Sequence, residues 1–134
     1  MNDQANDVIR VEEVMHTDFH VVDGTDTVAT AIQLMKETNK HELIINKRND
    51  DDEYGYVQLS DIAKKVLAQD RSPSRVNLYE IMAKPVIHVR PTMDIKYCAR
   101  LFENFGLSAA PVMKNSLVVG VVTYKDIVLK GLLV

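Results

Sequence analysis

The residues whose side chains are best suited to bind a ligand are Thr123, Lys125 and Asp126. They place a hydroxyl, an ammonium group and a carboxylate within four positions. A helix is predicted to begin near Lys125-Asp126. Backbone N–H groups at a helix N-terminus favour phosphate, as a lysine does, whereas a carboxylate accepts hydrogen bonds from sugar hydroxyls. The segment therefore suits a ligand that carries both groups. The alternative is that Asp126 only caps the helix and Lys125 is solvated.

A second, weaker version of this segment occurs earlier in the chain. Asp61 follows Gly55 as Asp126 follows Gly120, and a shift of 65 positions relates the two stretches. Gln58 stands where the later segment has Thr123, and no lysine precedes the carboxylate. Ser60 could partly replace the missing hydroxyl, so Asp61 remains a candidate for holding a sugar.

The elements that position these segments repeat along the chain. Met15 and Met82 are 67 positions apart, and the same shift relates Thr25 to Thr92 and Leu34 to Leu101. A constant shift over many positions indicates a duplicated supersecondary unit. Each copy reads as an extended segment, a helix (27–38 or 94–105), two apolar strands joined by a turn, and a final helix. The predicted boundaries are 8–67 for the first repeat, 68–77 for a linker and 78–134 for the second repeat.

Composition sets the broad class of the protein. The 134 residues are 46% hydrophobic and 26% charged, and the net charge of -3 argues against a nucleic-acid partner. The polar, acidic start lacks the features of a signal peptide, and charged residues interrupt the apolar stretch from 117 to 134. We therefore expect a cytoplasmic α/β protein without direct membrane insertion. Cys98 lies in an apolar helical pattern and is predicted to be a core residue.

The tandem β-α-β-β-α units resemble a pair of CBS domains, also called a Bateman module. The resemblance rests on the openings Val14-Met15 and Ile81-Met82, on the strand 108–112 and on the Gly120–Asp126 turn, and it covers residues 8–134. It implies a pseudo-two-fold pair of repeats that binds AMP, ADP or ATP, with S-adenosylmethionine as an alternative. It also implies a homodimer that regulates an unknown partner protein and requires no cofactor.

The resemblance further implies two clefts that are built crosswise, each from the Asp-bearing turn of one repeat and two strands of the other. The first cleft then comprises Thr123, Lys125 and Asp126 with Thr17, Phe19, His20, His41, Glu42 and Leu43. The second, weaker cleft comprises Gln58, Ser60 and Asp61 with Val86, Ile87, His88, Ser108, Ala109, Ala110 and Pro111. One occupied cleft per chain is expected, and the sequence leaves open which one.

Other interpretations compete with this one. The pair could be a structural dimerisation or docking module with empty clefts, as the departures at Gln58 and His41-Glu42 suggest. Catalysis lacks a recognised motif, so we expect no enzymatic activity. His16, Asp18 and His20 alternate and share one face of an extended chain, but three ligands without a cysteine make a weak metal site. The acidic run 50–53 lacks the spacing of a calcium loop and is predicted to be a solvated hairpin tip.

Overall fold

The computed structural model describes residues 7–132, which divide into two compact units. The central unit is Phe19–Val86, and the split unit combines residues 7–18 with residues 87–132. Each unit contains helices and a small β-sheet, so the predicted α/β class is confirmed. No helix within residues 7–132 is both long and apolar enough to span a bilayer.

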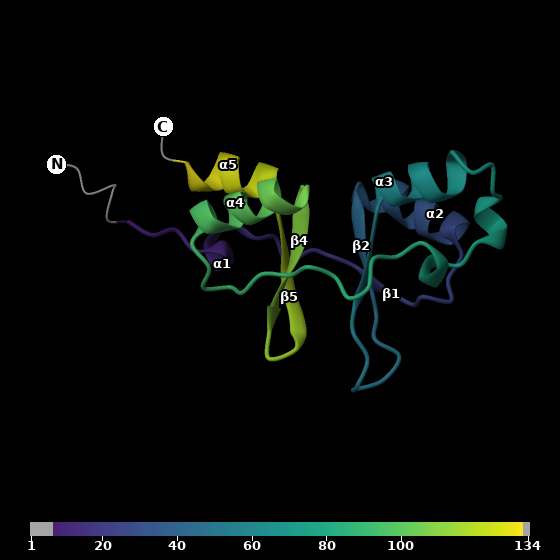
Figure 1. Cartoon of the computed structure of the whole chain (residues 1–134), viewed down its shortest axis with the longest axis horizontal. Helices are drawn as coiled ribbons and strands as arrows, with labels where there is room; N and C mark the ends of the chain where they lie inside the picture. Colours follow the sequence, from purple (N-terminus) through teal and green to yellow (C-terminus); the bar gives the residue numbers. More distant parts are fainter. Residues whose placement is uncertain (1–6, 133–134) are drawn as a thin grey trace. The chain divides into compact units, whose positions relative to one another are not determined.

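The central unit is built on a three-stranded sheet in the order β1-β2-β3, and Figure 1 labels its strands β1 and β2. Strand β1 (Val21–Val22) runs parallel to β2 (Glu42–Ile45), and β2 runs antiparallel to β3 (Gly55–Gln58). Helix α2 (Val28–Thr38) connects β1 to β2, and helix α3 (Leu59–Ile62) follows β3 and continues as a π-helical turn, Ala63–Leu67. Two 3₁₀ turns follow, Pro73–Arg75 and Leu78–Glu80.

Local sequence rules explain the ends of α2. The Thr27 hydroxyl accepts a 3.1 Å hydrogen bond from the Thr30 N–H and caps the first turn. Asn39 ends the helix in the left-handed conformation, with φ of 54°. The apolar stripe of the helix faces the core, which consists of Val28, Ala31, Met35, Leu43, Ile45, Val57, Val66, Val76, Leu78 and Ile81.

The split unit pairs β4 (Ala109–Lys114) with β5 (Leu117–Thr123) in an antiparallel hairpin. Helices α4 (Ile95–Phe105) and α5 (Tyr124–Gly131) pack on it together with α1 (Val11–Val14), and Figure 1 shows α4 and α5 beside the hairpin. The first strand of this repeat is reduced to one parallel bridge between Val89 and Val112, which corresponds to the pair Val22 and Ile45 in the central unit. The core of the split unit is Val11, Val14, Val89, Ile95, Cys98, Phe102, Ala110, Val112, Val122 and Ile127.

The compact units and the sequence repeats divide the chain differently. Val11 and Val14 precede the first repeat's helix, yet they are buried in the core of the split unit. Leu78 and Ile81, which stand 67 positions later, are buried in the core of the central unit. Each repeat therefore gives its leading segment to the core of the other. Each buried aliphatic side chain of this kind contributes about 1.5–3 kcal/mol, which favours the exchange over leaving the segment exposed.

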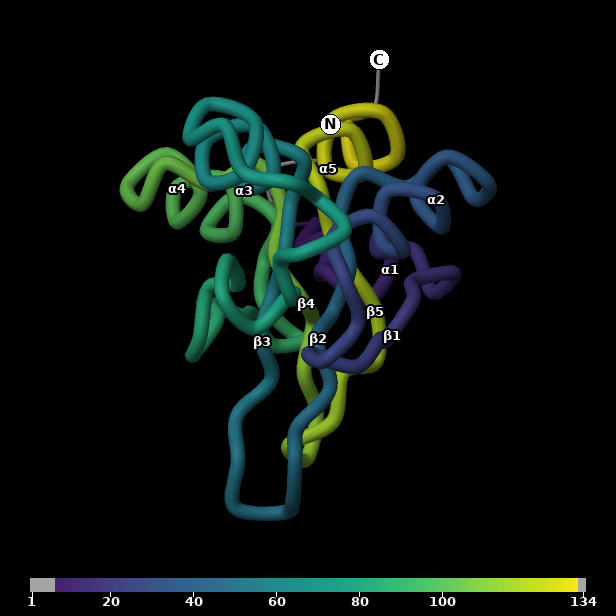
Figure 2. Tube along the Cα trace, turned by 90° about the vertical axis from the view of Figure 1, so that its right-hand side faces the viewer, coloured from purple at the N-terminus to yellow at the C-terminus, as the bar shows by residue number. Residues whose placement is uncertain are grey.

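The turn between β2 and β3 differs in part from the prediction. Figure 2 shows this turn extending well past the strands that it joins. Asp50, Asp51 and Glu53 are exposed, as expected of a solvated hairpin tip. The prediction is wrong for Asp52, whose side chain is only 7% exposed because it forms ion pairs with Arg48 and Lys84.

Candidate functional site

The Asp126 turn joins β5 to α5 through a capping box. The Thr123 hydroxyl accepts a 3.1 Å hydrogen bond from the Asp126 N–H, and the Thr123 N–H donates to Oδ2 of Asp126 at 3.0 Å. These reciprocal bonds satisfy backbone groups that the helix itself cannot pair. The local sequence thus fixes the position of the carboxylate at the start of α5.

Residue Asp126 is 6% exposed, and further hydrogen-bond donors surround its carboxylate. Oδ2 also accepts the Thr123 hydroxyl at 3.0 Å and lies 2.9 Å from Nδ1 of His16, while Nζ of Lys130 lies 3.1 Å from Oδ1. Burial acts to raise the pKa of Asp126, but the hydrogen bonds from His16, Lys130 and Thr123 outweigh it, and the pKa is lowered. Asp126 is therefore an ionised carboxylate already engaged by the protein on both oxygens.

The Asp61 turn has the same design with fewer partners. The Gln58 N–H donates to Oδ2 of Asp61 at 2.9 Å, and Nζ of Lys65 lies 3.5 Å from Oδ1. The Asp61 side chain is 21% exposed, compared with 8% for Asp126. Because a carboxylate offers about four acceptor positions, Asp61 keeps more capacity for a ligand than Asp126 does.

Each Asp-bearing turn lies beside the start of the strand that follows the helix in its own repeat. The Tyr124 N–H donates to the Ser108 carbonyl at 3.2 Å, and the Leu59 N–H donates to the His41 carbonyl at 3.1 Å. The register agrees, since Ala109 pairs with Thr123 in one unit and Glu42 pairs with Gln58 in the other. The proposed crosswise pairing of these strands with the opposite turns stays a prediction.

The leading segment of each repeat does meet the last strand of the other. His16 and Val121 exchange backbone hydrogen bonds of 3.0 Å inside the split unit. Ala83 and Tyr56 form the corresponding pair inside the central unit, at 2.9 and 3.0 Å. These contacts bring His16 within hydrogen-bond distance of Asp126. The equivalent residue near Asp61 is Ala83, whose side chain has no hydrogen-bond donor.

Besides His16, which the sequence suggested only as part of a weak metal site, three contributors to these turns were missed by sequence reasoning. Lys130 and Lys65 lie four residues after Asp126 and Asp61, and this helical spacing is a signal that could have identified them. Tyr56 had no comparable signal. Its hydroxyl is buried without a hydrogen-bond partner among the described residues, and burial together with the charges of Glu42 and Asp61 raises its pKa. An unsatisfied donor thus lies near two of the predicted site residues.

The remaining predicted residues fall into two groups. Leu43 and Ala110 are 1% and 0% exposed and belong to the two cores, so almost no surface of either residue is open to a ligand. Partial or full exposure leaves the side chains of the others accessible. These residues are Thr17, Phe19, His20, His41, Ser60, Val86, Ile87, His88, Ser108 and Lys125, while Ala109 and Pro111 are buried.

The metal alternatives gain no support from the geometry. Within residues 7–132, no group of three or more His, Cys, Asp or Glu side chains is arranged to hold a metal ion. His16, which alternates with Asp18 and His20 in the sequence, is directed to the Asp126 carboxylate. The acidic run at the β2–β3 turn uses its one buried member, Asp52, in ion pairs with Arg48 and Lys84.

Comparison with known proteins places this geometry in a family. The family model for the CBS domain matches residues 11–68 and residues 78–131. The chain is similar to a hexameric CBS-CP12 protein from bloom-forming cyanobacteria, at 37% sequence identity, 93% coverage of this chain, 73% coverage of that chain and a TM-score of 0.89. It is also similar to a conserved CBS domain protein of unknown function from Thermoplasma acidophilum, at 28% identity. That match covers 94% of this chain and 70% of that chain, with a TM-score of 0.85.

A third solved structure shares the fold at 24% identity, with a TM-score of 0.78 and coverage of 90% of this chain and 94% of that one. It is a CBS domain pair in complex with 5′-methylthioadenosine and S-adenosyl-L-methionine. No curated protein matches the chain.

Proposed function

Because the chain belongs to the CBS-domain family, with one domain at residues 11–68 and another at residues 78–131, we propose that it is a regulatory module that reversibly binds an adenosyl compound. AMP, ADP and ATP are the first candidates, and S-adenosylmethionine is the alternative. Ligand binding would modulate a partner protein. Regulatory sensing of cellular metabolites requires affinities of about micromolar to millimolar, or roughly -8 to -4 kcal/mol.

The observation that carries this proposal is the capped Asp turn, present in both units. Each turn holds a carboxylate at a helix start, directly after a strand with a glycine three residues before its last residue. A carboxylate that accepts hydrogen bonds from two ribose hydroxyls, next to N–H groups that donate to a phosphate, would bind the two polar parts of a nucleotide. The resemblance to CBS domains implies that the aspartate holds the ribose and that a threonine at the position of Thr123 contacts the phosphate.

We place the ligand at the Asp61 turn in preference to the Asp126 turn. The Asp126 carboxylate is already in contact with donors on His16, Lys130 and Thr123, about 3 Å from its oxygens. A ribose would have to displace these donors. Asp61 accepts one N–H and faces Lys65 at 3.5 Å. The unsatisfied Tyr56 hydroxyl adds a donor close to Asp61 that a polar ligand atom could use. The residue at the equivalent position of the other repeat is Val121, which lacks a polar group.

A homodimer is the assembly that we propose for the chain. Helices α4 and α5 expose large apolar side chains, including Tyr97 at 52%, Phe105 at 59% and Leu129 at 72% exposure. Covering such side chains favours association. Size-exclusion chromatography with light scattering tests this proposal at tens of micromolar protein, and a monomeric mass would contradict it.

The test of the ligand site is isothermal titration calorimetry with AMP, ATP and S-adenosylmethionine. Wild type is compared with Asp61→Ala and Asp126→Ala, after circular dichroism has confirmed that each variant is folded. We expect one ligand to bind wild type and Asp126→Ala, and to lose binding to Asp61→Ala. If only Asp126→Ala loses binding, the function stands and the choice of turn is wrong. If no ligand binds wild type, the alternative of a structural docking module is favoured.

A further inference from the structure

A pocket of about 770 Å³ lies within the central unit, away from the Asp61 turn. Its lining comes from the residues just after β1, the residues just after β2 and the segment around Tyr79 and Lys84. Because β1 and β2 are parallel, they end at the same edge of the sheet. Strand β3 is antiparallel to β2, so the Asp61 turn begins at the opposite edge. The pocket is therefore separate from the site proposed above.

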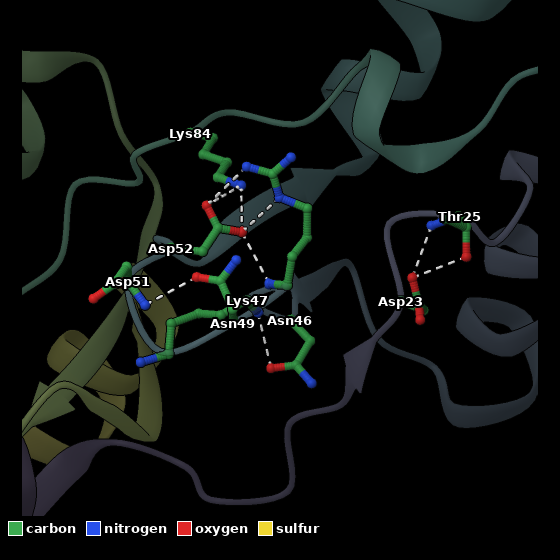
Figure 3. A network of polar contacts seen from close by, with 9 residues as sticks. Asp23, Thr25, Asn46, Lys47, Asn49, Asp51, Asp52 and Lys84 are labelled. Atoms are coloured by element: carbon green, nitrogen blue, oxygen red, sulfur yellow. Dashed lines mark hydrogen bonds and ion pairs between the residues drawn. The ribbon is translucent and has the colours of Figure 1, made fainter.

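Three cationic side chains line this pocket: Lys47, Arg48 and Lys84. Asp52 holds two of them in place, with Nε of Arg48 at 3.0 Å from Oδ2 and Nζ of Lys84 at 2.7 Å from Oδ1 (Figure 3). The Arg48 N–H donates to Oδ2 as well, at 2.9 Å. Asp52 thus brings together cations from two distant segments and orders them before a ligand binds. This order lowers the entropic cost of binding an anion.

Asp23 gives the pocket a fixed acceptor. Its Oδ1 accepts the Thr25 N–H at 3.0 Å and the Thr25 hydroxyl at 2.9 Å. These bonds lower the pKa of Asp23, so the carboxylate is ionised at neutral pH. With Asp23 and Asp52 both ionised, the cations still outnumber the carboxylates by one. The charge pattern thus combines an anion-binding end with an acceptor for hydroxyl groups.

Tyr79 supplies an apolar face to the same pocket. The residue is 56% exposed, and its backbone N–H donates to the Gly24 carbonyl at 3.0 Å. A Cβ atom built on Gly24 would lie 3.3 Å from Cγ2 of Ile45 and 3.4 Å from Cβ of Tyr79, so the segments that line the pocket are in close contact at this position. An exposed ring at the edge of a pocket can cover the flat or apolar part of a ligand.

We propose that this pocket is a second ligand site, which binds an organic phosphate with a hydroxyl-bearing body. The phosphoryl group would contact Lys47, Arg48 and Lys84, while hydroxyls of the body would donate to Asp23. Lysine and arginine are the side chains that bind phosphate most strongly, and the bonds are charge-assisted. The proposal does not depend on the adenosyl site at Asp61.

The second repeat cannot form the same site. A shift of 67 positions takes Lys47 to Lys114 but takes Arg48 to Asn115, and the residues equivalent to Lys84 and Tyr79 are Thr17 and Glu12. Only one of the three cations is therefore kept. Lys114 provides a matched control, since it is a lysine at the corresponding turn without the rest of the pocket.

The experiment is calorimetric titration of the full chain with ribose 5-phosphate and with inorganic phosphate, at about 50 mM salt so that charge contacts are not screened. The variants are Lys47→Met, Lys84→Met, the control Lys114→Met and Asp61→Ala. We expect ribose 5-phosphate to bind wild type at least tenfold more tightly than inorganic phosphate does. Lys47→Met and Lys84→Met should each weaken it about tenfold, which corresponds to about 1.4 kcal/mol. Lys114→Met and Asp61→Ala should leave it unchanged.

Several results would overturn the proposal. Absence of binding to wild type would do so, and so would equal affinities for the two probes, which would leave no role for the body of the ligand. An equal loss in Lys114→Met would indicate non-specific charge attraction, and a loss in Asp61→Ala would place the probe at the adenosyl site. Amide chemical-shift mapping on wild type gives a check that needs no variant, because the shifts should centre on Thr25, Asn46 and Lys47.

Discussion

Nδ1 of His16 lies 2.9 Å from Oδ2 of Asp126, although 110 positions separate the two residues in the chain. The contact attaches the leading segment of the first repeat to the start of α5, where Thr123 and Lys130 bind the same carboxylate. One buried charge therefore joins three parts of the split unit. Its removal should affect the stability of the protein as well as any ligand at this turn.

Asp126→Asn is expected to lower the free energy of unfolding at pH 7 by about 1–3 kcal/mol, because hydrogen bonds to a charged group contribute more than neutral ones. The folded-state pKa of Asp126 is lowered, so this contribution is complete above the ordinary pKa near 3.8 and disappears as the pH falls below it. Urea unfolding at pH 7 and at about pH 3 measures the effect. The difference between wild type and variant should shrink at the lower pH.

Asp61→Asn is the matched control for this prediction. Asp61 occupies the same position in its own capped turn, but it is more exposed and has fewer donors. Its effect on the free energy of unfolding at pH 7 should therefore be smaller. If Asp126→Asn lowers the free energy of unfolding by the same amount at both pH values, the charge of the carboxylate is not what stabilises the turn.

Gly120→Ala should destabilise the protein more than Gly55→Ala, although the two glycines occupy equivalent positions in β5 and β3. A Cβ atom on Gly120 would lie 3.0 Å from the backbone carbonyl oxygen of His16 as well as 2.5 Å from Sδ of Met15. On Gly55 the tightest contact is again a methionine sulfur, Sδ of Met82 at 2.5 Å, and a flexible side chain can move aside. Overpacking of this kind costs about 1–3 kcal/mol. Thermal unfolding of both variants provides the comparison, and equal losses would contradict it.

Phe102→Ala is expected to lower the free energy of unfolding by about 3–5 kcal/mol, because it empties a fully buried position in the split unit. Phe102 is 0% exposed and makes an edge-on contact with the Tyr124 ring, at 5.2 Å between centroids. Phe105 lies one turn further along α4 and is 59% exposed, so Phe105→Ala should change stability by less than about 0.5 kcal/mol. Chemical denaturation of the two variants measures both values, and similar losses would contradict the exposed position of Phe105.

Cys98 should resist thiol reagents in the folded protein. Burial raises the pKa of its thiol to about 11, and the residue is 0% exposed. Because the thiolate is the reactive form, labelling at pH 8 should be slower in the native protein than in urea by roughly a hundredfold or more. Absorbance of released thionitrobenzoate follows the reaction. Native labelling at the unfolded rate would contradict the burial of Cys98.

Local patterns predicted much of the fold. The predicted helix at 27–38 is present as Val28–Thr38 with Thr27 as its cap, and the predicted helix at 94–105 is present as Ile95–Phe105 with Asp94 as its cap. Gly106 ends the second helix in the left-handed conformation, as its residue type suggested. These features depend on residues within a few positions of each other, so the sequence contains the whole signal.

The sequence by itself therefore determined the duplicated α/β units, the caps of their helices and the carboxylate at the start of each final helix. Only the tertiary structure decided which leading segment enters which core, since Val11 and Val14 are apolar residues that suit either one. The burial of this leading segment in the split unit brings His16 to Asp126. The path of the chain past the β2–β3 turn brings Lys84 to Asp52, 32 positions away. Contacts over such separations depend on how the segments between them pack, and residue spacing does not encode that packing.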